Sequence, residues 1–218
     1  MVLKRTNAAL IALVLIPVVA IAGIAAWRQR ETRALVEGLA KGQWVASYSM
    51  PSASMLPTLE KGDYLYAVTR AFADRIPVRG EIAIYERDDG APFIHRIVGV
   101  PGDRIALRNG ILHFNGMPIT REHVGRHEGG DGGATLVLYR ETLPGGAPHL
   151  IAEAEDNARY DNFDEVIVPP DHVFVLGDNR DNSADSRYFG PVPVDRLRDK
   201  PTFVWWSDDR SRIGMPIR

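Results

Sequence analysis

The sequence predicts a mainly β protein. We expect an antiparallel β-sheet or partial barrel with an inserted β-rich part, preceded by one N-terminal transmembrane helix. Three observations predict this fold class: an uncharged N-terminal run, many short apolar runs separated by turn residues, and Asn-Gly pairs between such runs. With 218 residues, the chain is long enough for one full-sized domain and an anchor.

The uncharged run covers residues 8–26. Lys4 and Arg5 precede it, and Trp27 follows it at a position that suits a membrane interface. A helix over residues 6–27 would be about 33 Å long, which matches the ~30 Å hydrocarbon core of a bilayer. A cleaved signal peptide is the alternative, since it also has a basic start and small residues. We favour an uncleaved anchor, because the run is long for a signal peptide and arginines follow it directly.

These features predict that the chain has four parts. These are a cytoplasmic tail (1–7), a transmembrane helix (8–27), a juxtamembrane linker (28–46) and a folded domain (47–218), in which residues 121–165 form an inserted elaboration. Charge alone leaves the orientation of the anchor open. Arg28, Arg30, Arg33 and Lys41 follow the run, and by the positive-inside rule they would place the large domain in the cytoplasm.

The domain is expected to consist of short strands. The apolar runs that indicate them are Tyr64–Thr69, Glu81–Tyr85, Phe93–Val98, Ile105–Leu107, Ile111–Phe114, Thr135–Tyr139 and His172–Leu176. Asn109-Gly110 predicts a tight hairpin between two of these runs, and Asn115-Gly116 marks another turn. Glu122–Ala134 is rich in Gly, His and charge, and we interpret it as a mobile loop.

Composition excludes several function classes. The net charge is −2, so no basic footprint indicates a nucleic-acid partner. The absence of Cys excludes disulfides, thiolate catalysis and Cys-ligated zinc. His123 and His127 have the four-residue spacing of two zinc ligands on one helix. However, no Glu follows His123, and the surrounding glycines argue against a helix, so we do not interpret the pair as a zinc site. We expect neither a metal nor a cofactor.

The segment Pro51–Leu59 is the first candidate for chemistry. Its two serines, two prolines and threonine fix the backbone and are unsuited to a helix interior or a regular strand. A serine held on such a rigid turn can be aimed as a nucleophile. The alternative is an ordinary surface turn, in which Ser and Pro are common.

Four segments together resemble one family. In chain order they are Pro51–Leu59, Gly62–Val68, Phe93–Asp103 and Gly177–Gly190. They resemble the motifs of the type I signal peptidases in order and rough spacing, over about residues 47–205. The last segment, GDNRDNSADSRYFG, is nearly identical to its family motif. The resemblance implies an endopeptidase that removes signal peptides from exported preproteins after small residues, typically Ala at the last and third-from-last positions.

The resemblance also implies roles for individual residues. Ser54 aligns with the nucleophile, and Ser52 with a serine whose hydroxyl joins the backbone N–H of the nucleophile in an oxyanion hole. Ser183 aligns with a serine that orients the base. The positions that support the site in the family are those of Arg96, Asp178, Asp185 and Arg187.

The sequence departs from the bacterial pattern at the general base. Bacterial members have Lys before the Arg of the third motif, whereas this chain has His95. The lysines present (Lys4, Lys41, Lys61 and Lys200) all lie outside the motif. Histidine can serve as the base, since its reference pKa of ~6.5 leaves much of it neutral at pH 7. The endoplasmic-reticulum and archaeal branches of the family also pair Ser with His.

An imidazole base is often oriented by a carboxylate, and our candidate for that carboxylate is Asp185, with Asp178 and Asp181 behind it. The family also implies the location: a single-pass protein of the cytoplasmic membrane with its domain on the extracytoplasmic face, whose partners are preproteins and the bilayer. Two alternatives stay open. One is a peptide-binding subunit on the same scaffold that has lost its base. The other is a specialised peptidase with one client, such as a pilin or conjugation factor.

Overall fold

The computed structural model describes residues 44–87, 90–128, 134–154 and 160–218. The chain divides into two compact units, Met1–Gly42 and Gln43–Arg218. The expected tail, the transmembrane helix and most of the linker lie outside the described residues. Within the part of the chain that is described, no helix has the length and apolar character needed to cross a bilayer.

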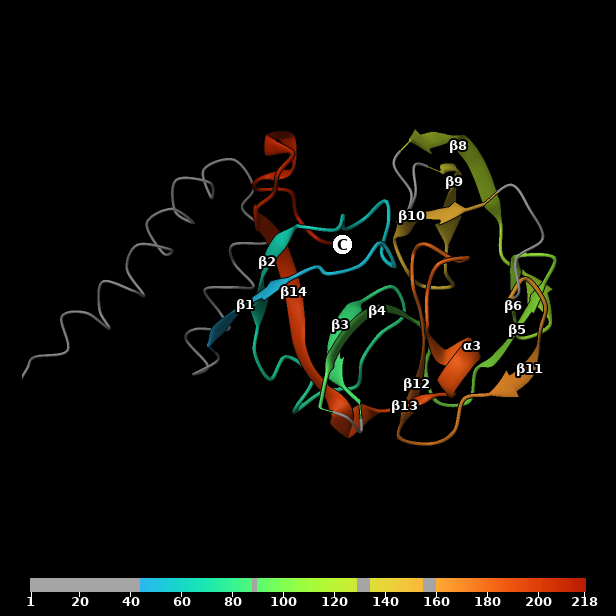
Figure 1. The fold of residues 1–218 in the computed structure, drawn as a ribbon. Coiled ribbons are helices and arrows are strands. Elements are labelled where there is room, and N and C mark those ends of the chain that lie inside the picture. Colours follow the sequence, from blue (N-terminus) through green and yellow to red (C-terminus); the bar gives the residue numbers. More distant parts are fainter. Residues whose placement is uncertain (1–43, 88–89, 129–133, 155–159) are drawn as a thin grey trace, which may run out of the picture. The chain divides into compact units, whose positions relative to one another are not determined.

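The second unit is mainly β, as predicted, and its largest sheet has seven strands in the order β1-β2-β14-β3-β4-β12-β13 (Figure 1). Each neighbouring pair in this sheet is antiparallel. The strands are β1 (Val45–Ser49), β2 (Tyr64–Val68), β14 (Leu197–Trp206), β3 (Ile82–Glu86), β4 (Pro92–Gly99), β12 (His172–Leu176) and β13 (Val192–Pro193). The long strand β14, although it is last in the sequence, lies between β2 and β3.

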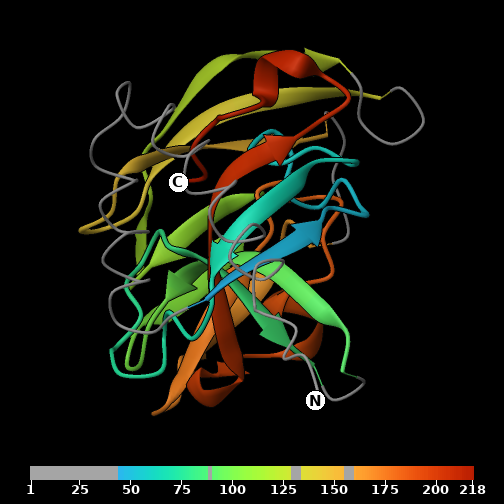
Figure 2. The same cartoon turned by 90° about the vertical axis from the view of Figure 1, so that its left-hand side faces the viewer.

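Two smaller antiparallel sheets complete the unit, and Figure 2 shows them from a second direction. One has the order β10-β9-β8, with β10 (Pro148–Glu153), β9 (Thr135–Thr142) and β8 (Arg121–Glu128). The other has the order β11-β5-β6-β7, with β11 (Phe163–Ile167), β5 (Arg104–Arg108), β6 (Ile111–Phe114) and β7 (Met117–Pro118). The short helices are α3 (Ser186–Phe189), η2 (Val194–Arg196) and η3 (Arg210–Arg212).

The predicted strands and turns agree with this architecture except at one segment. Asn109 and Gly110 both have positive φ, at 49° and 74°, and connect β5 to β6 as the Asn-Gly pair predicts. The interpretation of Glu122–Ala134 as a mobile loop is wrong for residues 122–128. These residues belong to β8, which pairs with β9 from Arg121↔Glu141 to Glu128↔Thr135. Strand pairing outweighs the low β-propensity of Gly and the charged residues here.

Successive side chains of the central strands point to opposite faces of the sheet, so each strand contributes to two hydrophobic clusters. On β12, Phe174 and Leu176 belong to one cluster, whereas Val173 and Val175 belong to another on the opposite face. Tyr85 of β3 lies in the cluster of Val173 and Val175, with no exposed surface. His95 of β4 pairs directly with Ala83 of that cluster. The face that carries His95 is therefore packed against hydrophobic side chains.

Candidate active site

The first part of the site is the loop between β1 and β2 (residues 50–63), which carries Ser52 and Ser54 and which we call the serine loop. Its two ends are held together because Met50 N–H donates to Asp63 O (2.7 Å) and Gly62 N–H donates to Met50 O (2.8 Å). Met55 and Leu59 are completely buried in the cluster beneath β2 and β3. These two buried side chains and the two hydrogen bonds at its ends anchor the loop to the domain, and its residues form turns, as the sequence predicts.

The backbone of Ser54 is fixed by a segment that is distant in sequence. Asn179 donates its backbone N–H to Ser54 O (3.0 Å) and its side-chain amide to Ala53 O (3.0 Å). Arg180 N–H in turn donates to Ala152 O of β10 (2.9 Å). The segment from Gly177 to Arg180 thus connects the serine loop to the three-stranded sheet. At the side chain, Ser52 Oγ donates to Ser54 Oγ over 3.2 Å.

The imidazole of His95 is buried, with 2 % of the residue exposed. Its Nδ1 lies 2.8 Å from Tyr85 Oη, and its Nε2 lies 3.2 Å from Ser183 Oγ. Burial lowers the pKa of His95 to about 4 and outweighs the opposing effect of the Asp185 and Asp178 carboxylates. The ring is therefore neutral at pH 7, which is the protonation state of a general base.

Gly177 allows Ser54 and Ser183 to come close together. A Cβ at this position would overlap with the Ser183 side chain, and it would lie 2.5 Å from Ser54 O. Only glycine provides this space, so the glycine that opens the last motif has a direct steric role. It brings Ser183, and the His95 nitrogen that faces it, next to the serine loop.

Asp185 acts on His95 through its charge, and no hydrogen bond joins the two side chains among the described residues. The carboxylate accepts from Arg187 Nε (2.9 Å), Arg187 Nη2 (2.8 Å) and Gly177 N–H (3.0 Å). Burial opposes its ionisation, but the hydrogen bonds and charge of Arg187, together with the Gly177 N–H and His95, hold the pKa of Asp185 below its ordinary value. Asp185 and Arg187 thus fix the turn that carries Ser183, and the negative charge favours the protonated form of His95.

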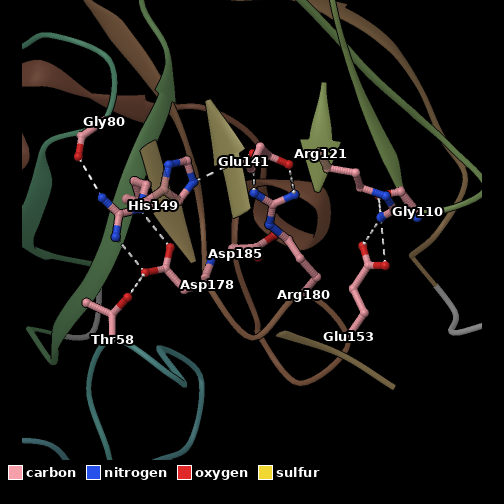
Figure 3. Close-up of polar contacts among 12 residues, drawn as sticks. Thr58, Gly80, Gly110, Arg121, Glu141, His149, Glu153, Asp178, Arg180 and Asp185 are labelled. Atoms are coloured by element: carbon pink, nitrogen blue, oxygen red, sulfur yellow. Dashed lines mark hydrogen bonds and ion pairs between the residues drawn. The ribbon is translucent and has the colours of Figure 1, made fainter. Parts of the chain in front are cut away.

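A buried ion pair lies behind the site. Arg96 donates to both carboxylate oxygens of Asp178, at 2.8 and 2.6 Å, and to Gly80 O at 2.8 Å. Thr58 Oγ1, from the serine loop, donates to the same carboxylate (2.5 Å). Figure 3 shows Thr58 and Asp178 directed at each other. This pair therefore connects β4, the end of β12 and the serine loop.

A second buried pair holds the three-stranded sheet in place. Arg180 donates to the two carboxylate oxygens of Glu141, at 3.1 and 2.7 Å, and His149 Nε2 lies 3.6 Å from the same carboxylate (Figure 3). Burial disfavours charge on Glu141, yet Arg180 keeps the pKa of Glu141 below its ordinary value. The pair joins β9 to the segment that fixes Ser54.

Ser54 and His95 line one cavity of about 530 Å³. The residues around it come from the serine loop, from the start of β4 and from the turn before α3. They are Met50, Pro51, Ser52, Ser54, Pro92, Phe93, Ile94, His95, Asp181, Asn182, Ser183 and Ala184. Among the described residues, no hydrogen bond joins Ser54 Oγ to the His95 ring. Hydrogen bonds of this kind are often long in unliganded enzymes and tighten when substrate binds.

The structure brings together the four residues expected at the reacting centre, namely Ser52, Ser54, His95 and Ser183. The four expected supporting residues (Arg96, Asp178, Asp185 and Arg187) are all buried and form two ion pairs. Neither lysine of the described residues lines the cavity, since Lys61 is exposed and Lys200 pairs with Glu81. In the described ranges, no group of three His, Asp or Glu side chains is arranged to hold a metal ion.

Sequence reasoning missed Tyr85 and Asn179. Tyr85 lies in a predicted strand, where an aromatic residue is ordinary, and its contact with His95 depends on the pairing of β3 with β4. Asn179 lies inside the last motif, but its partner Ser54 is more than a hundred residues away along the chain. The motif itself was the signal available for Asn179, whereas no signal in the sequence marked Tyr85.

A serine on a clamped loop that shares a cavity with a neutral, buried imidazole is the arrangement of a nucleophilic hydrolase. Residues 7–206 match the family described as "Signal peptidase, peptidase S26". The chain is 33% identical to signal peptidase I of Pseudomonas aeruginosa, over 78% of this chain and 71% of that protein. It is 32% identical to signal peptidase I of Rickettsia prowazekii, over 73% of this chain and 71% of that protein.

The chain therefore belongs to the signal peptidase family S26 and is a serine endopeptidase. The resemblance to type I signal peptidases is confirmed. A solved signal peptidase I from Enterococcus faecalis aligns with 56% of this chain and 94% of that chain at 23% identity. The TM-score of this alignment is 0.34.

Proposed function

We propose that this serine endopeptidase removes signal peptides from exported preproteins after small residues, with Ser54 as nucleophile and His95 as general base. The observation that carries the proposal is the shared cavity of Ser54 and His95, in which the imidazole is buried and neutral. A lysine is charged at neutral pH and can act as a base only if burial lowers its pKa. A histidine is largely neutral at that pH and can accept a proton without such a large shift.

The reaction would proceed by acyl transfer. Ser54 Oγ, which accepts a hydrogen bond from Ser52 in this structure, turns toward His95 Nε2 when a substrate is bound. Nε2 takes the hydroxyl proton while Oγ attacks the scissile carbonyl, and the imidazolium then protonates the departing amine. Water, deprotonated by the same ring, hydrolyses the acyl-enzyme and releases the signal peptide. The Ser52 hydroxyl and the Ser54 N–H stabilise the oxyanion in both steps.

The polar residues around the cavity would have supporting roles. Ser183 lies at hydrogen-bonding distance from the nitrogen that accepts the proton, so it fixes the plane of the ring. Asp185, although it makes no hydrogen bond to the ring, stabilises the imidazolium through its charge. Arg187 and the Arg96–Asp178 pair hold the surrounding backbone. No metal or cofactor takes part in this mechanism.

We place the enzyme in the cytoplasmic membrane, anchored by residues 8–27, with its domain on the extracytoplasmic face. The long uncharged run supports the anchor. The positive-inside rule would place the domain in the cytoplasm, but the cleavage sites of exported preproteins emerge on the outer face, and we therefore place the domain there. An anchor would hold the cavity close to the bilayer from which signal peptides are presented.

Cleavage is expected to require small residues at the last and third-from-last positions of the signal peptide. An extended peptide would lie along strand edges, and apolar side chains such as Met50, Phe93 and Ile94 limit the space around the cavity. The full chain in lipid vesicles should cut a preprotein with an Ala-x-Ala site directly after the second Ala, as N-terminal sequencing of the product would show. Replacement of that Ala by Phe should abolish the cut. Equal cleavage of both preproteins would contradict the proposal.

The pH profile should distinguish a histidine from a lysine base. Since the free His95 ring has a pKa of about 4, kcat/KM should stay level between about pH 5 and 8 and fall only as the ring becomes protonated near pH 4. In His95→Lys, the base must lose a proton that the histidine lacks at neutral pH, so the optimum should move to higher pH. Initial rates on one peptide across pH 3–10 provide the test. An identical profile for the two enzymes would argue against a base at position 95.

A further inference from the structure

We propose that Tyr85 is a positioning residue for the base: its hydroxyl oxygen accepts the Nδ1 hydrogen of His95 and so leaves Nε2 free to take the Ser54 proton. This inference rests on the proposed function and adds a third member, from β3, to the Ser54–His95 pair. In Ser-His-Asp enzymes a carboxylate holds the corresponding nitrogen. Here that place is occupied by a phenol.

The geometry of the ring leads to this assignment. Tyr85 Oη lies 2.8 Å from Nδ1, the shorter of the two hydrogen bonds that the ring makes. Nε2 lies on the side of Ser183, which lines the cavity together with Ser54. A neutral imidazole carries one hydrogen, so the nitrogen that accepts a proton from the cavity must be the bare one. The hydrogen is then on Nδ1, where Tyr85 Oη is the partner.

No other side chain in the described residues can take this role. The Asp185 carboxylate is occupied by Arg187 and Gly177, and Asp178 is occupied by Arg96 and Thr58. Both carboxylates act on His95 through space, as does the Arg187 cation in the opposite direction. Tyr85 itself remains uncharged, because burial and the nearby Asp185 raise the pKa of its hydroxyl. It therefore provides a hydrogen bond without providing charge.

The proton balance is simple. In the forward step Nε2 gains the Ser54 proton, Nδ1 keeps its own hydrogen, and the resulting imidazolium donates from both nitrogens. Tyr85 neither gains nor loses a proton, but its bond to Nδ1 becomes charge-assisted and so stronger in the transition state. Because this strengthening is absent in the ground state, the hydroxyl should affect kcat more than KM.

The opposite arrangement makes the inference testable. A phenol can also donate, and within the described chain its hydroxyl has no hydrogen-bond partner besides His95. If Tyr85 donates to Nδ1, the ring hydrogen moves to Nε2, which then donates to Ser183 and cannot accept from Ser54. Tyr85 would in that case hold the base in its inactive tautomer. The two arrangements predict opposite effects of removing the hydroxyl.

The experiment compares Tyr85→Phe with the wild-type full chain in detergent, on a fluorogenic Ala-x-Ala peptide. We expect kcat to fall about 10- to 100-fold with KM unchanged, a loss smaller than the ~10⁴-fold seen when a triad carboxylate is replaced, because a neutral phenol stabilises the imidazolium less. The acid limb of the profile should also move to lower pH, since the protonated ring loses an acceptor. Tyr48→Phe is the matched control, because it removes a phenol that hydrogen bonds to Asp199 away from the cavity.

The tautomer can be observed without turnover. In the full chain labelled with ¹⁵N-histidine, two-bond ¹⁵N–¹H correlation spectra should show His95 protonated at Nδ1, with the resonance assigned by its loss in His95→Gln. Tyr85→Phe should shift the hydrogen toward Nε2. A wild-type ring protonated at Nε2, or a kcat of Tyr85→Phe that is unchanged or raised, overturns the inference. If Tyr85→Phe does not fold, the wild-type spectrum by itself tests the inference, because it shows which ring nitrogen of His95 carries the hydrogen.

Parallel assays separate this inference from the proposed function. If Ser54→Ala still cleaves the peptide, the proposed function fails whatever Tyr85 does. If cleavage requires both Ser54 and His95 but Tyr85→Phe behaves as the wild type, only the role of Tyr85 is lost.

Discussion

Replacing Ser54 by Ala is expected to lower kcat for preprotein cleavage by at least about 10⁴-fold, while the preprotein still binds. Ser54 is the hydroxyl that shares the cavity with His95, and its backbone is fixed by Asn179. If Ser54 is the nucleophile that we propose, removal of Oγ takes away the attacking atom and leaves the rest of the cavity intact, so only the chemical step should be lost. Single-turnover cleavage and preprotein binding, measured on the full chain in vesicles, separate these two effects.

A graded series makes this result specific. His95→Ala should lower kcat by about 10²–10⁴-fold, the usual contribution of a general base. Ser52→Ala should cost about 10²–10³-fold, as for the loss of one oxyanion donor. Ser211→Ala, which removes an exposed hydroxyl on η3, is the control and should leave kcat unchanged. Retained cleavage by Ser54→Ala would remove Ser54 as nucleophile, and retained cleavage by His95→Ala would remove the imidazole from the mechanism.

Replacing Asp178 by Ala is expected to lower the free energy of unfolding by about 3–5 kcal/mol, the cost of leaving one member of a buried ion pair without its partner. Arg96 and Asp178 are 2 % and 1 % exposed, and the carboxylate also accepts from Thr58 of the serine loop. Burial disfavours the Asp178 carboxylate, but Arg96 holds the pKa of Asp178 below its ordinary value, so the carboxylate is charged at pH 7. Denaturant unfolding followed by tryptophan fluorescence measures the loss.

Two controls distinguish the loss of this pair from a general effect of lost charge. Glu165→Gln removes one member of an exposed ion pair with Arg104 and should leave stability unchanged. The double variant Arg96→Leu/Asp178→Leu removes both buried charges and should be less destabilised than Asp178→Ala, because no unpaired charge remains. If Asp178→Ala is no less stable than Glu165→Gln, the buried pair does not stabilise the fold.

Much of the fold could be predicted because its signals are local. The strand at His172–Leu176 has the same bounds in the sequence reading and in the structure, since a continuous apolar run is what a strand buried on both faces requires. Asn109-Gly110 predicted its hairpin because few other pairs tolerate two successive positive φ angles. The reading of Glu122–Ala134 was wrong over β8, because that strand depends on its partner β9 and not on its own composition.

The candidate site was predicted only in part. The motifs identified Ser52, Ser54, His95 and Ser183, and the structure places all four on one cavity. Asp185, expected as the orienting carboxylate, instead pairs with Arg187 and reaches His95 only through its charge. The hydrogen-bond partner of Nδ1 is Tyr85, which no motif indicated.

The sequence by itself determined which residues this serine endopeptidase has for chemistry, and that position 95, where we propose the general base, holds an imidazole in place of an amine. Only the tertiary structure decided how that imidazole behaves. Its two hydrogen-bond partners come from β3 and from the turn before α3, and its burial in the folded domain lowers its pKa. The physical reason is that side-chain identity is encoded locally, whereas desolvation and hydrogen-bond geometry depend on residues that only folding brings together.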